Sequence, residues 1–179
     1  HQKETAVVRL EEGLYFQKSS TNQTTYRLVK HEAEVLKILQ NEKFVPKLIF
    51  AGKCGEDYVY RTEVLTASKY NNTHLNSDII NLSKAIMSRN VSDLNLDKSE
   101  DNFFSHGDFT PWNILITENG LVVVDWEYAD MRPKYYDLNT YYFQSQFLLG
   151  DIETEKLLLN YEAICTNNNL PWPDILSSL

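Results

Sequence analysis

The stretch HGDFTPWN at residues 106–113, followed by DWE at residues 125–127, decides the fold. Between them lies Asn119-Gly120, a dipeptide typical of the two-residue turn of a β-hairpin. Short apolar runs at residues 114–117 and 121–125 flank this turn and have the composition of strands. Because a hairpin returns the chain on itself, we expect the two quoted stretches to lie side by side at the mouth of one cleft.

Three polar side chains in these stretches, Asp108, Asn113 and Asp125, form a set with a definite chemistry. An Asn carbonyl and an Asp carboxylate are hard oxygen ligands that suit Mg²⁺. A carboxylate five residues before the Asn can accept a hydroxyl proton or orient an attacking group. This spacing matches the catalytic loop of kinases, which is followed by a metal-binding Asp. An isolated D-x-x-x-x-N is common by chance and would make Asp108 a turn or cap residue.

The first part of the chain has the pattern of paired strands with one helix. The β-branched and aromatic runs at residues 5–10 and 13–18 predict a hairpin, and Lys18 ends what we expect to be an edge strand. Apolar residues at helical spacing predict a helix over residues 26–41. A second strand pair is expected at residues 48–51 and 58–63.

The rest of the chain is mainly helical. A polar connector is expected over residues 66–77, and Ser77 is the expected N-cap of the helix that follows. Gly150 is the expected C-cap between the last two helices. Helices are expected over residues 78–87, 135–149 and 151–166.

Composition excludes several classes of protein. The net charge of -8 over 179 residues argues against a nucleic-acid partner, because phosphate backbones are bound through clustered Lys and Arg. No apolar run approaches the roughly 18 residues of a membrane span, and the first residues lack a signal peptide, so we expect a soluble, cytoplasmic protein. The two cysteines are far apart and are expected to be free thiols. The six glycines spell neither of the glycine-rich phosphate-binding motifs.

With these residues in view, the sequence resembles a known family. HGDFTPWNIL followed by VVVDWE is similar to the catalytic core of the aminoglycoside phosphotransferase and choline kinase family, small-molecule kinases with a protein-kinase-like fold. The resemblance is specific over residues 104–137, and YDL at residues 136–138 adds to it. Upstream, HEAEVL at residues 31–36 resembles the family's helix whose Glu pairs with a strand Lys.

The resemblance implies roles for the residues at the motif positions. They are Asp108 as catalytic base, Asn113 and Asp125 as Mg²⁺ ligands, Lys18 as a contact to the α and β phosphates of ATP, Glu32 as the partner of Lys18, and His106 as a brace of the catalytic loop. Asp137 would anchor this loop from behind, and Glu127 would contact metal or substrate or be a solvated acid. Two alternatives stay open: Glu34 in place of Glu32, and a solvated role for Lys18.

The implied fold is α+β and bilobal: a reduced nucleotide-binding lobe at residues 1–66, with a small antiparallel sheet and one helix, and a mainly helical catalytic lobe with a hairpin at residues 67–179. The implied activity is ATP- and Mg²⁺-dependent phosphorylation of a hydroxyl on an aminoglycoside, a choline-like amine or a sugar. A nucleotide-binding pseudokinase or scaffold is the main alternative. A metal-dependent phosphoesterase using His106, Asp108 and Asp125 ranks last, because only one histidine is near the motif.

The shortage of glycines has its own implication within this family. If Lys18 lies on the third strand of a kinase-like lobe, the phosphate-covering loop belongs upstream of residue 5. We therefore expect that loop to be missing or replaced, and the chain to be a small member of the family or a fragment of a longer protein.

Overall fold

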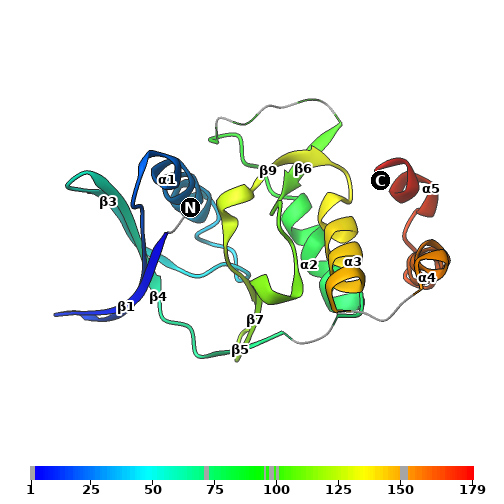
Figure 1. Cartoon of the computed structure of the whole chain (residues 1–179), viewed down its shortest axis with the longest axis horizontal. Helices are drawn as coiled ribbons and strands as arrows, with labels where there is room; N and C mark the ends of the chain where they lie inside the picture. The colour runs from blue at the N-terminus through cyan, green and yellow to red at the C-terminus, as the bar shows by residue number, and fades with distance from the viewer. Residues whose placement is uncertain (1–2, 71–72, 95, 97–98, 100, 150–152) are drawn as a thin grey trace. The chain divides into compact units, whose positions relative to one another are not determined.

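The computed structural model describes residues 3–70, 73–94, 96, 99, 101–149 and 153–179. The chain divides into two compact units, one of His1–Ser68 with Leu115–Tyr128 and the other of Lys69–Ile114 with Ala129–Leu179. Figure 1 shows the elements of each in chain order. These units differ from the predicted lobes in two respects: the first boundary lies after Ser68 rather than after residue 66, and residues 115–128 belong to the N-terminal unit. Within the described residues, no helix is both long and apolar enough to span a bilayer.

The first unit is built on a four-stranded antiparallel sheet of order β1-β2-β4-β3. Strands β1 (Glu4–Leu10) and β2 (Gly13–Ser19) form the predicted hairpin, and β3 (Leu48–Cys54) and β4 (Asp57–Glu63) form the second predicted pair. Because β2 lies between β1 and β4, the expectation that Lys18 ends an edge strand is wrong.

Helix α1 (Gln23–Ile38) supplies the buried helical face of this unit. Its first turn is closed by a capping box, in which the Asn22 side chain accepts hydrogen bonds from backbone N–H groups, that of Thr25 among them, and the Thr25 side chain binds back to the Asn22 backbone. This cap explains why the helix begins three residues before the predicted start at residue 26. The helix ends at Ile38, three residues before the predicted end at residue 41, and Leu39 is its C-cap.

The predicted second hairpin is formed by β7 (Ile114–Thr117) and β8 (Gly120–Val123). A short strand, β5 (Ala67–Lys69), pairs with β7 inside the region expected to be a connector. All three residues of β5 are exposed, so the backbone pairing, and not burial, makes this segment a strand. The single turn η2 (Trp126–Tyr128) follows β8.

The second unit contains helices α2 (Ser77–Met87), α3 (Tyr136–Leu149), α4 (Thr154–Asn167) and α5 (Trp172–Ser177). The single turn η1 (Pro111–Asn113) lies in the catalytic-loop segment. Two strands, β6 (Asn102–Ser105) and β9 (Asp130–Pro133), pair antiparallel. Neither α5 nor the β6–β9 pair was expected from the sequence.

The sequence predicts a helix N-cap at Ser77 and a helix C-cap at Gly150. Ser77 is not the N-cap of α2, because the side chain of Asn76 accepts from the N–H groups of Asp78 and Ile79 at 3.0 and 3.1 Å. Asn and Ser are comparable N-cap residues, so their preferences do not distinguish Asn76 from Ser77. The predicted C-cap at Gly150 lies outside the described residues.

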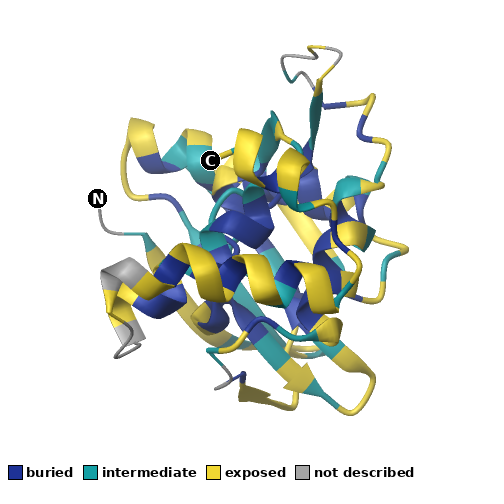
Figure 2. Cartoon of the chain, turned by 90° about the vertical axis from the view of Figure 1, so that its right-hand side faces the viewer, coloured by how far each residue is buried: buried dark blue, intermediate teal, exposed yellow. Residues whose placement is uncertain are grey.

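Aromatic side chains fill much of the core of the second unit. Tyr142 of α3 stacks on Tyr161 of α4 with ring centroids 4.3 Å apart, and Trp172 of α5 meets Tyr161 edge-on at 5.5 Å. Both tyrosines are buried. The helices carry both buried and exposed residues (Figure 2), as expected for helices that cover a core with one face.

Candidate active site

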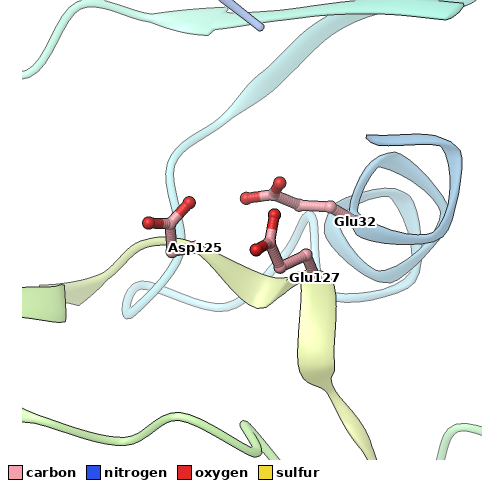
Figure 3. Close-up of side chains that lie close together, drawn as sticks. All are labelled: Glu32, Asp125 and Glu127. Carbon is pink, nitrogen blue, oxygen red and sulfur yellow. The ribbon is translucent and has the colours of Figure 1, made fainter. Parts of the chain in front are cut away.

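A buried lysine, Lys18, is the centre of a charged cluster in the first unit. Its Nζ donates to Oε2 of Glu32 on α1 at 2.7 Å and to Oδ1 of Asp125, which follows β8. Oε2 of Glu127 in η2 lies 3.9 Å from the same nitrogen. Lys18 and Glu32 are 3% and 1% exposed. Figure 3 shows the carboxylates of Glu32, Asp125 and Glu127 pointing toward one another.

The backbone and a neighbouring strand hold these groups in place. The second oxygen of Glu32, Oε1, accepts the backbone N–H of Trp126 at 3.1 Å, so both carboxylate oxygens are occupied. Trp126 is fully buried, and its indole N–H donates to the carbonyl of Val123 at 2.8 Å. Asp125 has a φ of 66°, a left-handed conformation that is uncommon outside glycine and often found at functional sites.

Tyr60 completes the surroundings of the Lys18–Glu32 pair. It lies opposite Lys18 in the β2–β4 register, is 3% exposed, and its hydroxyl is hydrogen-bonded to Glu32. Burial, and then the charge of Glu32, raise the pKa of Tyr60 well above its ordinary value. The phenol therefore keeps its proton and donates a hydrogen bond to the carboxylate of Glu32.

Burial and charge act against each other on the ion pair. Burial by itself lowers the pKa of Lys18, but the carboxylates of Glu32 and Asp125 outweigh it, and this pKa is raised. Burial raises the pKa of Glu32, and the opposing effect of Lys18 offsets only part of that rise. Lys18 consequently carries its positive charge at neutral pH.

The structure distinguishes Glu32 from Glu34, the alternative partner for Lys18. Glu34 is exposed, and its Oε1 lies 3.5 Å from Nζ of Lys30, four residues earlier on the same helix. Its side chain is half exposed, as is that of Lys30. Glu32 is therefore the residue of α1 that pairs with Lys18. The buried position of Lys18 also excludes the solvated alternative.

A cavity of about 400 Å³ lies beside this cluster, within the first unit. Its walls are largely apolar and include Val7, Phe16 and Leu36, while Lys18 and Asp125 lie at its charged part. An apolar pocket with a few convergent polar groups is the usual form of a small-molecule site. The cavity thus joins an apolar wall to a part that holds charged side chains.

In the second unit, Asp108 and Asn113 lie together, as their spacing predicts. The amide nitrogen of Asn113 donates to the backbone carbonyl of Asp108 and to its Oδ2, both at 2.9 Å. Asn113 is 5% exposed. Because the amide nitrogen of Asn113 donates both hydrogen bonds, the amide oxygen is the atom that can bind a metal ion.

His106 and Asp137 hold the backbone of this loop. Asp137 accepts the hydroxyl of Ser105 at 2.6 Å and the N–H groups of His106 and Gly107 at 2.8 and 3.2 Å. The His106 side chain is fully buried, and its Nδ1 accepts the N–H of Asp108 at 3.2 Å. These contacts are those of a brace and an anchor, the roles that the family resemblance implies for the two residues.

The side chains fit a magnesium ion in chemical type. Asp125 offers a carboxylate and Asn113 an amide oxygen, both of which Mg²⁺ prefers. Carboxylate oxygens of Glu32, Asp125 and Glu127 also lie within 4.8 Å of one another. Asp125 belongs to the first unit and Asn113 and Asp108 to the second, so a meeting of the three stays a prediction.

Several residues of the site were not found from the sequence. Lys3 donates a hydrogen bond to Glu127, Tyr60 binds Glu32, and Ser105 binds Asp137. Lys3 lies two residues before Thr5, the spacing that puts side chains on one face of a strand, and this spacing was a signal for Lys3. No motif or regular spacing in the sequence marks Tyr60 or Ser105 as a residue of the site.

The fold is that of small-molecule kinases with a protein-kinase-like architecture. An aminoglycoside-3'-phosphotransferase of type VIII has a TM-score of 0.55 at 13% identity, over 87% of this chain and 90% of that chain. The amicoumacin kinase hAmiN, in complex with AMP-PNP, Ca²⁺ and Ami, has a TM-score of 0.58 at 10% identity, over 93% and 70%. The choline kinase LicA from Streptococcus pneumoniae has a TM-score of 0.51 at 14% identity, over 86% and 75%. These similarities confirm the predicted α+β fold.

The sequence comparisons match part of the chain to a family. Residues 83–164 match the model of the phosphotransferase enzyme family APH. The Protein LicA homolog of Mycoplasma capricolum subsp. capricolum is 36% identical over 81 residues, a match that covers 40% of this chain and 34% of that protein. The matched part is thus about a third of the length of this curated relative. The predicted resemblance to the aminoglycoside phosphotransferase and choline kinase family is confirmed for the segment that holds HGDFTPWN and DWE.

Proposed function

We propose that the protein transfers the γ-phosphoryl group of ATP to a hydroxyl group of a small molecule, with Mg²⁺ as cofactor. The observation that carries this proposal is the buried Lys18, held by Glu32 and Asp125 beside an apolar cavity. Burying a charged lysine is unfavourable unless an opposite charge pairs with it. A lysine that is buried and paired therefore indicates a site that uses the positive charge. The base of the nucleotide would occupy the apolar part of the cavity, and the phosphates of the nucleotide would lie at Lys18.

The residues of the second unit supply the acceptor chemistry. The hydroxyl oxygen of the acceptor bonds to the γ-phosphorus while the bond to the bridging oxygen breaks and ADP leaves. Asp108 takes the hydroxyl proton, and Asn113 holds the Asp108 side chain at 2.9 Å. When bound, Mg²⁺ supplies neutralisation of the phosphate charge, with Asn113 and Asp125 as its ligands. Positioning and charge stabilisation account for most of such catalysis.

We infer that the acceptor is a positively charged small molecule, either an aminoglycoside or a choline-like amine, with sugars as the neutral alternative. The net charge of -8 supports a cationic acceptor, because acidic surfaces attract cations. The related structures include an aminoglycoside phosphotransferase and a choline kinase.

The test is ADP formation from ATP and Mg²⁺ over a panel of aminoglycosides, choline-like amines, sugars and nucleosides. We expect an acceptor-dependent rate that falls by about 10²–10⁴-fold in Asp108→Asn, the contribution of a positioned general base. Asp101→Asn is the matched control, since it removes an exposed carboxylate of the same unit, and it should keep the rate. Asp125→Ala should lose the thermal stabilisation that ATP with Mg²⁺ gives to the wild type.

Two outcomes would replace the proposal. Nucleotide binding without transfer to any acceptor, and with no effect of Asp108→Asn, would define a pseudokinase or scaffold. Release of phosphate from phosphomonoesters without any nucleotide would define a phosphoesterase. The structure disfavours the second, because His106 is buried and its Nδ1 is occupied by the backbone of the loop.

A further inference from the structure

A second lysine reaches the charged cluster from the strand next to β2. Lys3, immediately before β1, donates a hydrogen bond to Oε2 of Glu127. The same oxygen lies 3.9 Å from Nζ of Lys18. The side chain of Lys3 is 20% exposed and that of Glu127 is 8% exposed. The ammonium groups of Lys18 in β2 and of Lys3, just before β1, therefore approach one carboxylate oxygen.

Lys3 lies one residue before the paired part of β1, whose register begins at Glu4 opposite Ser19. Side chains two residues apart along a strand share a face, so an extension of β1 by one residue puts Lys3 on the face of Thr5 and Val7. Both Thr5 and Val7 line the cavity, and Thr5 lies opposite Lys18. Lys3 thus continues the cavity-lining row of β1 past Thr5, at its Lys18 end.

The charges in the cluster decide what Lys3 can bind. The three carboxylates of Glu32, Asp125 and Glu127 face the two ammonium groups of Lys3 and Lys18, which leaves a net charge of one negative unit. Any cation that joins the carboxylates weakens the attraction of Glu127 for Lys3. The side chain of Lys3 is more exposed than that of Lys18 and is flexible, so its ammonium group can turn to a new anion.

We propose that Lys3 is a second polyphosphate-binding residue, which Glu127 holds near Lys18 and which turns to the phosphates when a nucleotide occupies the cavity. This inference rests on the proposed function, because it needs a nucleoside polyphosphate in that cavity. It assigns Glu127 to positioning Lys3 and Lys3 to binding the nucleotide.

Calorimetric titration of the full chain with AMP-PNP and with adenosine, each with Mg²⁺, tests the role of Lys3. In Lys3→Gln we expect AMP-PNP to bind about tenfold more weakly, the effect of one charge-assisted hydrogen bond, and adenosine to bind as in the wild type. Lys3→Arg should restore most of the affinity for AMP-PNP. Lys30→Gln is the matched control, because it removes the same charge from α1 at a half-exposed ion pair.

Each other result overturns the inference in a recognisable way. Equal affinity of wild type and Lys3→Gln for AMP-PNP removes Lys3 from the phosphate site. An equal loss for adenosine assigns Lys3 a structural role only. Tighter binding of AMP-PNP by Lys3→Gln makes Lys3 a competitor of the metal. A wild type that binds neither ligand contradicts the proposed function itself, and the inference with it.

Discussion

Replacing Lys18 by Met tests how the buried cluster is stabilised. The variant keeps a long side chain in β2 but leaves Glu32, which is 1% exposed, without the ammonium group at 2.7 Å. Removing one partner of a buried ion pair costs about 3–5 kcal/mol. Glu32 keeps the N–H of Trp126 at 3.1 Å, so we expect the lower end, about 3 kcal/mol at pH 7. Urea unfolding of both proteins measures this difference in free energy.

The pH dependence of Lys18→Met provides a sharper test of the same reasoning. In the wild type the pKa of Glu32 is already raised by burial, and Lys18 opposes that rise, so the variant should raise it further. A carboxyl group whose pKa is raised by folding loses stability as the pH rises above its ordinary value of 4.5. The stability deficit of the variant should therefore shrink between pH 7 and pH 5, as Glu32 takes up a proton.

The raised pKa of Lys18 acts in the same direction at alkaline pH, as a loss of stability when the pH rises. Its raised pKa means that the stability from its charge is present below the ordinary value of 10.5 and is lost as the pH rises through the folded-state pKa. Lys18→Met should lack this alkaline loss. Lys30→Met, which breaks the half-exposed pair with Glu34, should cost about 0.5 kcal/mol or less. A deficit for Lys18→Met that matches this control, or that is the same at pH 5 and pH 7, refutes the reasoning.

Three further predictions concern single features of the fold. Asp137→Asn should lower the free energy of urea unfolding by about 2–3 kcal/mol, because the charged oxygens of Asp137 accept three hydrogen bonds in a buried loop; a loss below about 0.5 kcal/mol would contradict this anchor. Asn22→Ala should lower the free energy of unfolding by about 1 kcal/mol, because the capping box is lost. Asn22→Asp should have nearly the melting temperature of the wild type, as measured by circular dichroism. Of the two free cysteines, exposed Cys54 should react quickly with a thiol reagent at pH 8, while Cys165 should react only in urea, since burial raises its pKa to about 11; two fast thiols in the native protein would disprove this.

Local patterns were sufficient for most elements of the fold. The hairpins around Glu11-Glu12 and Asn119-Gly120 and the helices α1, α2 and α3 follow from turn residues and hydrophobic spacing. Lys18 and Glu32 could be named only through the family resemblance, because 14 residues separate them and no local rule links a strand lysine to a helix carboxylate. The choice between Glu32 and Glu34 needed the structure, which shows which one is buried.

Features that depend on non-local backbone pairing were missed. Strands β6 and β9 are four residues each and distant in sequence, so their pairing leaves little trace in either segment. The exposed strand β5 likewise owes its form to β7. The neighbours of Lys18 in the sheet were misjudged for the same reason, because strand order decides whether a residue lies at an edge or inside.

The division of the first unit between two distant stretches of sequence limits how this protein can be cut or recombined. Residues 1–68 alone would lack the stretch Leu115–Tyr128. That stretch supplies the Trp126 N–H to Glu32, and the N–H of Val123 to the carbonyl of Phe44 at 2.8 Å. A gene fragment that ends at residue 68, or a chimera joined there, would separate Lys18 from Asp125. Exchange of substrate-binding parts between relatives should therefore succeed only with junctions that keep both stretches from one parent.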